Sequence, residues 1–447
     1  MKLRMPQIWS WDIATTSGWV PMANLLDNMI ILRGLTSFDG HVDSQIIQLR
    51  PRAGAPSIDG AVADRSQRPV PSLALAGSPN NAFGSGTGAG NLRIENTSVD
   101  ANPLRNILTS FDRSPDHLSS TFLSRRDAMN EVMNRALASL GSAMKAQVPG
   151  SEKLSANRII AEKMIRQGIG DVSSVYRTLV LKYRGLMGKC AQAHMLRNAP
   201  GVMDRDLKKS AFAPNVATYG GITPFSDNFH DMFQYNATNP LNSSGVGGVA
   251  ESFAIAEYLL CNGYSSSVVA GCHGIVGLNV PGYATWGWDE HSAGTSISLI
   301  ANSFAFRCVA SCLYELTQKL TEAKVFDETL IQLGGEFSRS PRVDQLGADH
   351  SPDGNVISLI SGAIRSPCVI GNTKPSTDPA HPGNYGIGDT MNIDGGNRQP
   401  GTGQQSSTIA QILRVAPPVP NDSSLLTEGS GGITAAVELA KNRGETG

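Results

Sequence analysis

The chain has 447 residues, of which 40% are hydrophobic and 17% charged, and its formal net charge is -1 at pH 7. A chain of this length and hydrophobic content can bury a large core, and its near-zero charge predicts no nucleic-acid partner. No apolar run approaches the ~20 residues that a membrane-spanning helix needs, which excludes a membrane span. The 47 glycines and 25 prolines are typical of a globular protein with many irregular loops.

The amino terminus and the cysteines bear on the compartment. Two early basic residues are followed by no apolar segment, so no signal peptide is predicted; the protein either stays inside the cell or is a mature or truncated form. The six cysteines form no Cys-x-x-Cys pair, which argues against a zinc ribbon, and their even number permits disulfides without establishing them. Cys308 and Cys312 are four positions apart on a predicted helix, and we interpret them as small buried residues rather than a redox pair.

The first predicted elements are a short helix over residues 19–27 and an apolar strand over residues 28–33 that ends at Gly34. A polar segment follows this strand and contains four functional side chains: Asp39, His41, Asp43 and Ser44. Residues 72–76 are the second predicted strand. The polar segment is therefore expected directly beyond the end of a strand.

A glycine-rich stretch follows the second predicted strand and has FGSGTGAGN at its centre. It resembles a phosphate-binding loop only loosely, because no Lys-Ser or Lys-Thr follows and no clear strand leads into it. Its composition predicts a flexible surface loop, with phosphate binding as the alternative.

Residues 116–195 are predicted to form a mostly helical insertion, because apolar residues recur there at helical spacing on both sides of Pro149 and Gly150. The insertion either packs on a sheet edge or caps a site. His194, at its end, is interpreted as structural. Turn residues dominate the stretch over residues 201–246, which predicts a long irregular loop.

The second half of the chain alternates helices with strands. Helices are predicted over residues 249–261 and 304–323, and strands over 266–271, 329–333 and 356–360. In the second helix, apolar residues recur at the period of one buried face: Phe306, Val309, Leu313, Leu316 and Leu320. These repeated units predict an α/β fold with a doubly wound, mainly parallel sheet and helices on both faces.

A segment of charged residues follows the strand predicted over residues 329–333. The chain breaks at two glycines and then presents five functional side chains within fifteen residues: Glu336, Arg339, Arg342, Asp349 and His350. Open α/β sheets bind ligands beyond the carboxyl ends of their strands, so this segment is predicted to carry a functional site. The alternative is an exposed polar loop.

A second candidate cluster lies in the sequence YATWGWDEHSAG. Its Asp289 and His291 are two positions apart and come after a predicted strand, so both can reach a common metal ion or substrate. With Glu336 and His350 they form a set of carboxylates and imidazoles that suits zinc. In the alternative, Asp289, Glu336 and Asp349 bind calcium through oxygen atoms and rigidify the region.

Together these motifs resemble the bacterial DUF1501 family of proteins of unknown function. The resemblance rests on G-W-D-E-H, G-E-F-S-R-S-P-R and A-D-H, which correspond to the family's G-W-D-x-H, G-E-F-G-R-T-P and D-H. It extends from the strand predicted over residues 28–33 to V-I-G-N-T at 369–373 and a late helix around 409–413. The family is placed within the alkaline-phosphatase-like and sulfatase superfamily, which implies a doubly wound sheet with metal ligands at the carboxyl ends of its strands.

Position by position, the resemblance implies roles for the candidate residues. Asp289 and His291 correspond to metal ligands. Glu336 takes the place of a superfamily ligand aspartate, and His350 that of a later ligand histidine. Arg339 is expected to pair with an anionic ester oxygen in bidentate fashion.

The resemblance also bears on the nucleophile. His41 falls roughly where sulfatase-like enzymes keep that residue, and Ser44 is the nearest hydroxyl. This chain departs from the superfamily pattern in two further respects. The first strand, which ends in a metal-binding aspartate, has no counterpart, and Glu336-Phe337 replaces the usual Asp-His pair.

Two classes of function follow. The first is an exported, metal-dependent hydrolase of phosphate or sulfate esters, with zinc as the expected ion and an anionic ester or polysaccharide as substrate. The second is a catalytically degenerate binding or assembly protein whose loops contact partners or further copies of the chain. The resemblance alone implies an extracytoplasmic location. We expect one alkaline-phosphatase-like domain over residues 1–447, with the insertion at 116–195 and an extension at 396–447 in which 433–441 form a short amphipathic helix.

Overall fold

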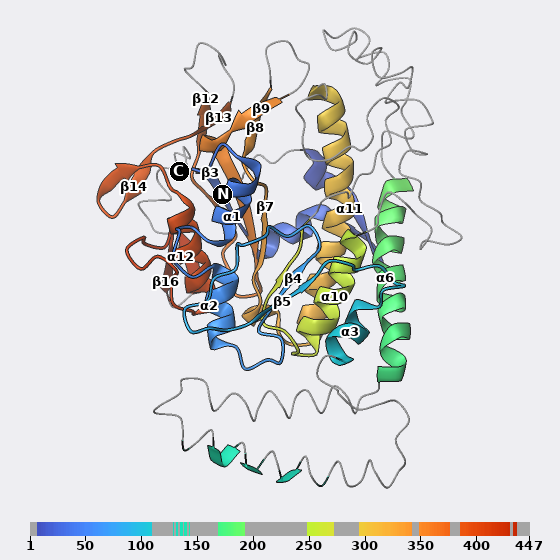
Figure 1. Ribbon diagram of the computed structural model, residues 1–447. Helices are drawn as coiled ribbons and strands as arrows, with labels where there is room; N and C mark the ends of the chain where they lie inside the picture. The colour runs from blue at the N-terminus through green and yellow to red at the C-terminus, as the bar shows by residue number, and fades with distance from the viewer. Residues whose placement is uncertain are drawn as a thin grey trace.

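The computed structural model of the protein places two sheets between layers of helices (Figure 1). The described ranges are 7–109, 169–192, 248–271, 295–341, 348–375, 385–429 and 432–435, with isolated helical positions between 128 and 143. Within these ranges the protein is an α/β structure with mixed and parallel strand pairs, as the sequence predicts at this level.

The larger sheet has four strands in the order β11-β3-β10-β7. Their bounds are Met29–Leu35 for β3, Ile331–Gly334 for β7, Asn355–Ile360 for β10 and Cys368–Ile370 for β11. Strand β10 runs antiparallel to both β3 and β7, whereas β11 runs parallel to β3. The strands predicted over residues 28–33, 329–333 and 356–360 are confirmed, but this sheet is mixed rather than mainly parallel.

The connection between β7 and β10 explains this direction. Its described residues form a hairpin of β8 (Ser338–Pro341) and β9 (Ala348–Ser351), followed by a 3-10 turn at Pro352–Gly354. The two arms of this hairpin run in opposite directions, so the chain returns to the end of the sheet where β7 finished and β10 runs antiparallel beside β7. Sequence periodicity detects a strand but not its direction.

The smaller sheet is parallel throughout and has the order β5-β4-β6. Strand β4 (Ser72–Leu75) is buried at every position and pairs with β5 (Asn91–Ile94). Its other neighbour, β6, covers only Val268–Val269 of the strand predicted over residues 266–271. Parallel sheets are covered on both faces, so their inner strands are apolar and buried, as β4 is.

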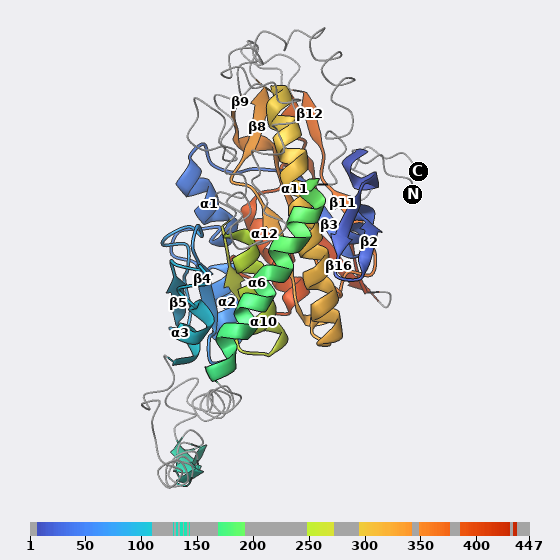
Figure 2. The ribbon, with the colours of Figure 1, turned by 90° about the vertical axis from the view of Figure 1, so that its right-hand side faces the viewer.

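One layer of helices consists of α6 (Ile169–Gln192), α10 (Val249–Cys261) and α11 (Thr295–Glu322), which pack together (Figure 2). The helix predicted over residues 249–261 is confirmed, and α11 begins earlier than the predicted 304. The apolar face predicted for α11 is buried at Val309, Leu313, Leu316 and Leu320, whereas Phe306 is 54% exposed. Cys308 and Cys312 are buried free thiols in this layer, as predicted.

The opposite face of the larger sheet packs on α12 (Thr402–Leu413), with α2 (Ile58–Arg65) beside it. In β3 the side chains alternate: Ile30 and Leu32 lie in this second core, and Met29 and Ile31 lie against the first. The larger sheet is therefore buried on both faces, which accounts for the continuous apolar run in β3.

The structure differs from the local predictions at three places. The helix predicted over residues 19–27 holds only for its later part, because β2 (Gly18–Pro21) pairs with β1 (Asp12–Thr15) before the 3-10 helix Met22–Asn28 begins. The polar segment after β3 contains the helix α1, His41–Leu49. Within the helix predicted over residues 433–441, the described residues belong to β17 (Gly432–Ala435), which pairs with β16 (Leu426–Gly429). Glycines at the facing strand ends favour that hairpin over a helix.

The insertion predicted over residues 116–195 is described mainly at α6, which is helical as expected. The remainder of the insertion, His194 and residues 201–247 lie outside the described residues, apart from the isolated helical positions.

The glycine-rich loop is organised around Asp64 of α2. The backbone amides of Gly86 and Thr87 lie 2.7 and 3.3 Å from the Asp64 carboxylate, which also accepts hydrogen bonds from the hydroxyls of Ser85 and Thr87. Partial burial alone would raise the pKa of Asp64, but these hydrogen bonds outweigh it and lower the pKa. The loop thus encloses a carboxylate of the chain itself, in the manner in which such loops enclose phosphates.

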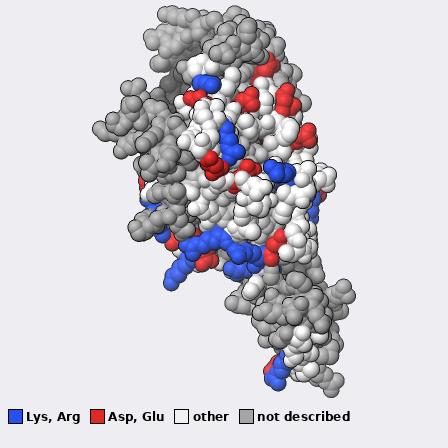
Figure 3. All heavy atoms as spheres, turned by 90° about the vertical axis from the view of Figure 1, so that its left-hand side faces the viewer, with Lys and Arg blue, Asp and Glu red and all other residues white. Residues whose placement is uncertain are grey.

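No helix in the described part of the chain combines the length and the apolar character that crossing a membrane requires. On the face drawn in Figure 3, acidic and basic side chains are interspersed, and basic ones gather toward the lower edge of the described surface. The absence of a nucleic-acid partner stays a prediction.

Candidate functional site

The candidate site lies at the edge of the larger sheet where β3 and β7 end. Both strands are antiparallel to β10, so their carboxyl ends meet at the same edge. Strand β3 is followed there by the turn into α1, and β7 by Glu336 and the hairpin β8–β9. Within the hairpin, Arg339 is paired with His350. This topology brings together two segments that are almost 300 positions apart in the chain.

The first contact of the site joins His41, at the start of α1, to Glu336. The imidazole Nδ1 lies 2.6 Å from Oε1 of the carboxylate, whose Oε2 accepts a hydrogen bond of 2.9 Å from Nε2 of Gln45. Arg339 Nη2 lies 3.6 Å from the same Oε1. Both carboxylate oxygens are therefore engaged with neighbouring side chains.

The second contact joins His350 of β9 to Asp39, which precedes α1. Nδ1 of His350 lies 2.7 Å from Oδ1 of Asp39. The two imidazole rings meet edge to face, with centroids 4.7 Å apart and an interplanar angle of 84°. The Phe337 ring lies 4.0 Å from the His350 ring and 5.2 Å from the His41 ring, and Arg339 lies over its face at 5.1 Å. Phe337 thus fixes the spacing of both histidines and the arginine.

These contacts determine which ring nitrogen is available for chemistry. A carboxylate can only accept a hydrogen bond, so Nδ1 of each imidazole donates to its carboxylate. The ring nitrogen that can take up a proton or bind a metal ion is then Nε2. Metal-binding histidines in proteins commonly carry a carboxylate in this position, where it fixes the tautomer and the ring orientation.

Ser44 occupies a different environment from the histidines. Its side chain is 0% exposed, and its hydroxyl is hydrogen-bonded to that of Ser37. Ser37 lies 2.7 Å from the backbone oxygen of Glu336, so that its hydroxyl can donate there. The two serines thus tie α1 to the segment after β7, and this burial does not favour the nucleophile role expected for Ser44.

The structure brings together part of the predicted residue set. His41, Glu336, Arg339 and His350 converge, whereas Asp289, His291 and Arg342 lie outside the described residues. Among the residues that the structure describes, no group of three or more His, Cys, Asp and Glu side chains is arranged to hold a metal ion. A metal ion bound by Nε2 of the two histidines would therefore need ligands from elsewhere.

Asp39 was named among the functional side chains after the first strand without an assigned partner, and sequence reasoning gave no role in the site to Gln45 or Phe337. Gln45 lies four positions after His41, which places both on one face of a helix. That spacing could have identified Gln45 only if α1 itself had been predicted. The contacts of Asp39 and Phe337 with His350 depend on the pairing of β8 with β9, because this pairing places His350 in the site. The sequence contains no local pattern that predicts the pairing.

The comparison with known families concerns the carboxyl-terminal part of this site. Residues 273–384 match the family model of the protein of unknown function DUF1501. The DUF1501 match includes Glu336, Arg339 and His350, and it excludes His41 and Asp39. It confirms the predicted resemblance for this segment, although the sequence predicted one that extends over most of the chain. No curated protein and no solved structure matches the chain, and the superfamily assignment stays a prediction.

Proposed function

We propose that this protein is a metal-dependent hydrolase of phosphate or sulfate esters, built on an alkaline-phosphatase-like, doubly wound scaffold and exported from the cytoplasm. One observation carries the proposal: His41 and His350 stand edge to face, each with a carboxylate on Nδ1, and Arg339 lies over the Phe337 ring that contacts both histidines. Two oriented imidazoles beside a guanidinium form a site for acid–base or metal chemistry on an anion.

Arg339 supports the anionic nature of the substrate. The guanidinium group matches the geometry of phosphate and sulfate oxygens, with which it forms bidentate hydrogen bonds. Its side chain is largely buried against Phe337, and its contact with Glu336 is a loose 3.6 Å. A substrate oxygen can therefore compete with Glu336 for the guanidinium group.

His41 is the residue we assign to proton transfer or attack. It begins α1, its side chain is more exposed than that of Glu336, and Glu336 holds its ring. In this arrangement Glu336 orients His41 through Nδ1, so that Nε2 can act on the substrate.

The described residues fit a zinc ion in part, because His350 supplies an imidazole with a carboxylate on Nδ1. Nε2 of His350 would bind the ion, and we propose Asp289 and His291 as the further ligands, so that Nε2 of His41 is left to act on the substrate. A bound zinc ion supplies Lewis acidity and lowers the pKa of a coordinated water molecule. Calcium suits the site less well, because both oxygens of Glu336 already face His41 and Gln45.

The test combines metal content with hydrolysis. Elemental mass spectrometry of the purified chain is expected to find zinc, and p-nitrophenyl phosphate or p-nitrophenyl sulfate is expected to be hydrolysed. His350→Ala and Asp289→Ala should lose both properties, whereas Asp353→Ala, a change of an exposed carboxylate close to β9, should lose neither. If metal content and hydrolysis were the same in all three variants, the proposed ligand set would be wrong.

A protein with neither metal nor hydrolysis would favour the second class of function. It would then be a binding or assembly protein on the same scaffold, and its self-association could be measured by analytical ultracentrifugation.

A further inference from the structure

A pocket lies at the end of the larger sheet opposite the candidate site. Its walls come from the 3-10 helix Met22–Asn28, the last turns of α11, the turn before β7 and the segment after β10, and its volume is about 580 Å³. Every wall residue belongs to the described part of the chain. A volume of this size is typical of small-molecule sites.

The pocket presents polar side chains that have no partner among the residues that the structure describes. For Asn24, Asp27, Gln318 and Lys324, the described part of the chain contains no side-chain hydrogen bond or ion pair. Asn24 and Asp27 come from the 3-10 helix Met22–Asn28, Gln318 comes from α11, and Lys324 lies just beyond the end of α11. Their hydrogen-bonding capacity is therefore open to a ligand.

Other wall residues are fixed by the protein and give the pocket its shape. Nδ2 of Asn28 donates to the backbone oxygen of Ile364 at 3.1 Å, and Asp327 pairs with Arg365 at 2.8 Å. A Cβ atom on Gly362 would lie 2.9 Å from Cδ1 of Phe326 and 3.0 Å from the backbone nitrogen of Asp327, so a side chain there would crowd this wall. One wall is thus held in place before any ligand binds.

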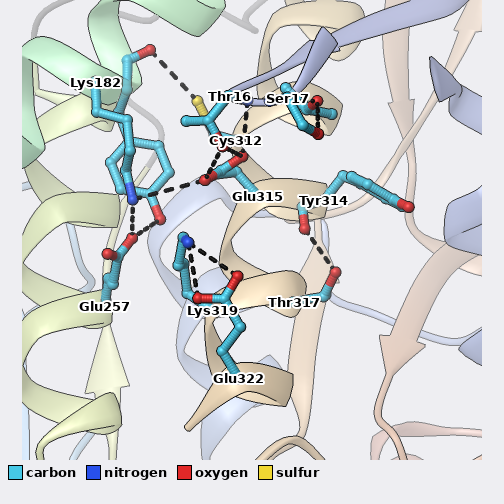
Figure 4. A network of polar contacts seen from close by, with 12 residues as sticks. Thr16, Ser17, Lys182, Glu257, Cys312, Tyr314, Glu315, Thr317, Lys319 and Glu322 are labelled. Atoms are coloured by element: carbon cyan, nitrogen blue, oxygen red, sulfur yellow. Dashed lines mark hydrogen bonds and ion pairs between the residues drawn. The ribbon is translucent and has the colours of Figure 1, made fainter. Parts of the chain in front are cut away.

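Two aromatic rings, Tyr314 and Phe326, complete the lining. Figure 4 shows the side chain of Tyr314 directed away from the buried network around Lys182 and Glu257. Both residues are half-buried and so leave part of the ring accessible. An exposed ring face can pack on the apolar C–H face of a bound molecule.

We propose that this pocket binds a neutral saccharide. Amide and carboxylate side chains donate to and accept from adjacent hydroxyl groups, and the aromatic rings cover the C–H faces of a sugar ring. An anionic ester fits less well. Arg365 is already paired with Asp327, and Lys324, the remaining cation among the described wall residues, is offset by the negative charge of Asp27. The charges of Asp27 and Lys324 balance, which is compatible with a neutral ligand.

The pocket is separate from the candidate site. Strand β3 runs from Met29, next to the pocket residue Asn28, to Leu35, close to Ser37 of the site. Its length corresponds to roughly 20 Å at about 3.3 Å per residue. The saccharide proposal is therefore independent of any hydrolytic activity, and its test requires none.

The test measures binding by the full-length protein. Isothermal titration and saturation-transfer NMR with cellotetraose, maltotetraose and chitotetraose are expected to detect at least one complex. Asp27→Ala and Gln318→Ala should each weaken that complex by about 10-fold, equivalent to one strong hydrogen bond. Thr321→Trp, at an exposed wall position of α11, should fill the pocket and abolish binding.

The matched control is Glu328→Ala. Glu328 is an exposed carboxylate of the same 3-10 turn as Asp327 but does not line the pocket, so binding should not change. If none of the three saccharides bound, or if the wall variants bound as tightly as the control, the proposal would be overturned. Binding of glutamate or glycine at the pocket without saccharide binding would overturn it too, since it would assign a zwitterionic ligand.

Discussion

Nδ1 of His41 lies 2.6 Å from Oε1 of Glu336, although the two residues are 295 positions apart. The carboxylate orients the ring, so Glu336→Gln should keep the shape of the site and lose the fixed tautomer. We expect the kcat/KM of ester hydrolysis to fall by about 10- to 100-fold, because Glu336 orients the residue that acts on the substrate. Steady-state kinetics measures this loss, and titration with a zinc chelator should show an unchanged zinc affinity. Glu328→Gln is the control, and equal losses in both variants would contradict the orienting role.

Lys182 is expected to be critical for stability. Its ammonium group forms an ion pair with Glu257 and lies 3.9 Å from Glu315, whose side chain is 2% exposed (Figure 4). Lys182→Met leaves two buried carboxylates without their cation, so the free energy of unfolding in urea should fall by about 3 kcal/mol.

Lys319 provides the matched control for that change. It pairs with Glu322 at 2.8 Å on the surface of α11, the helix that carries Glu315, and Glu322 is 64% exposed. Lys319→Met should cost less than about 1 kcal/mol, because surface ion pairs are screened by solvent. Equal losses for the two lysines would show that burial of the network has no energetic weight.

Asp64 should give the protein an acid-sensitive contribution to stability. Hydrogen bonds from the glycine-rich loop lower the pKa of Asp64 below its ordinary value of 3.8 in the folded protein. The stabilisation is then fully present above pH 3.8 and is lost as the pH falls through the lower folded pKa. Because solvent screens these partly exposed hydrogen bonds, urea unfolding of the wild type and Asp64→Ala should differ by only about 1 kcal/mol at pH 7, and this difference should shrink in acid. A difference that does not change with pH would contradict the charge-dependent role.

Gly34 should tolerate no side chain. Its φ is +73°, and a Cβ atom would lie 2.3 Å from the backbone oxygen of Asn372. Gly34→Ala should therefore destabilise the protein by about 3 kcal/mol or more, from backbone strain together with steric overlap. Gly54 has a similar φ of +80° with nothing within 4 Å, so Gly54→Ala should cost only the strain, about 1 kcal/mol. Thermal unfolding of both variants separates the two effects.

The elements that the sequence predicted well are those with an apolar buried face. Strand β3 and helix α10 are examples, since their apolar residues follow the period of a strand or a helix. Helix α1 was missed because its buried residues are Ser44 and Gln48, so no apolar period marks it. Helix α12 was predicted only over its last turn for the same reason, because the buried residues before Ile409 are polar.

Part of the site was predictable from two features of the sequence, the ends of the predicted strands and the charged residues that follow them. Charged residues just beyond β7 identified Glu336, Arg339 and His350 as candidates, and the segment after β3 supplied His41. The pairing of His350 with Asp39 was not predictable, because it depends on the register of β8 with β9 and on the direction of β10. Register and strand direction are set by long-range packing, which leaves no periodic pattern in the sequence.

The position of β3 has a consequence for the segment that matches DUF1501. Strands β7, β10 and β11 all lie within residues 273–384, but β3, which separates β10 from β11, comes from the beginning of the chain. A fragment limited to the matched residues would expose unpaired backbone groups along both β10 and β11. Open edges of this kind pair with other chains, so we expect such a fragment to aggregate rather than fold alone.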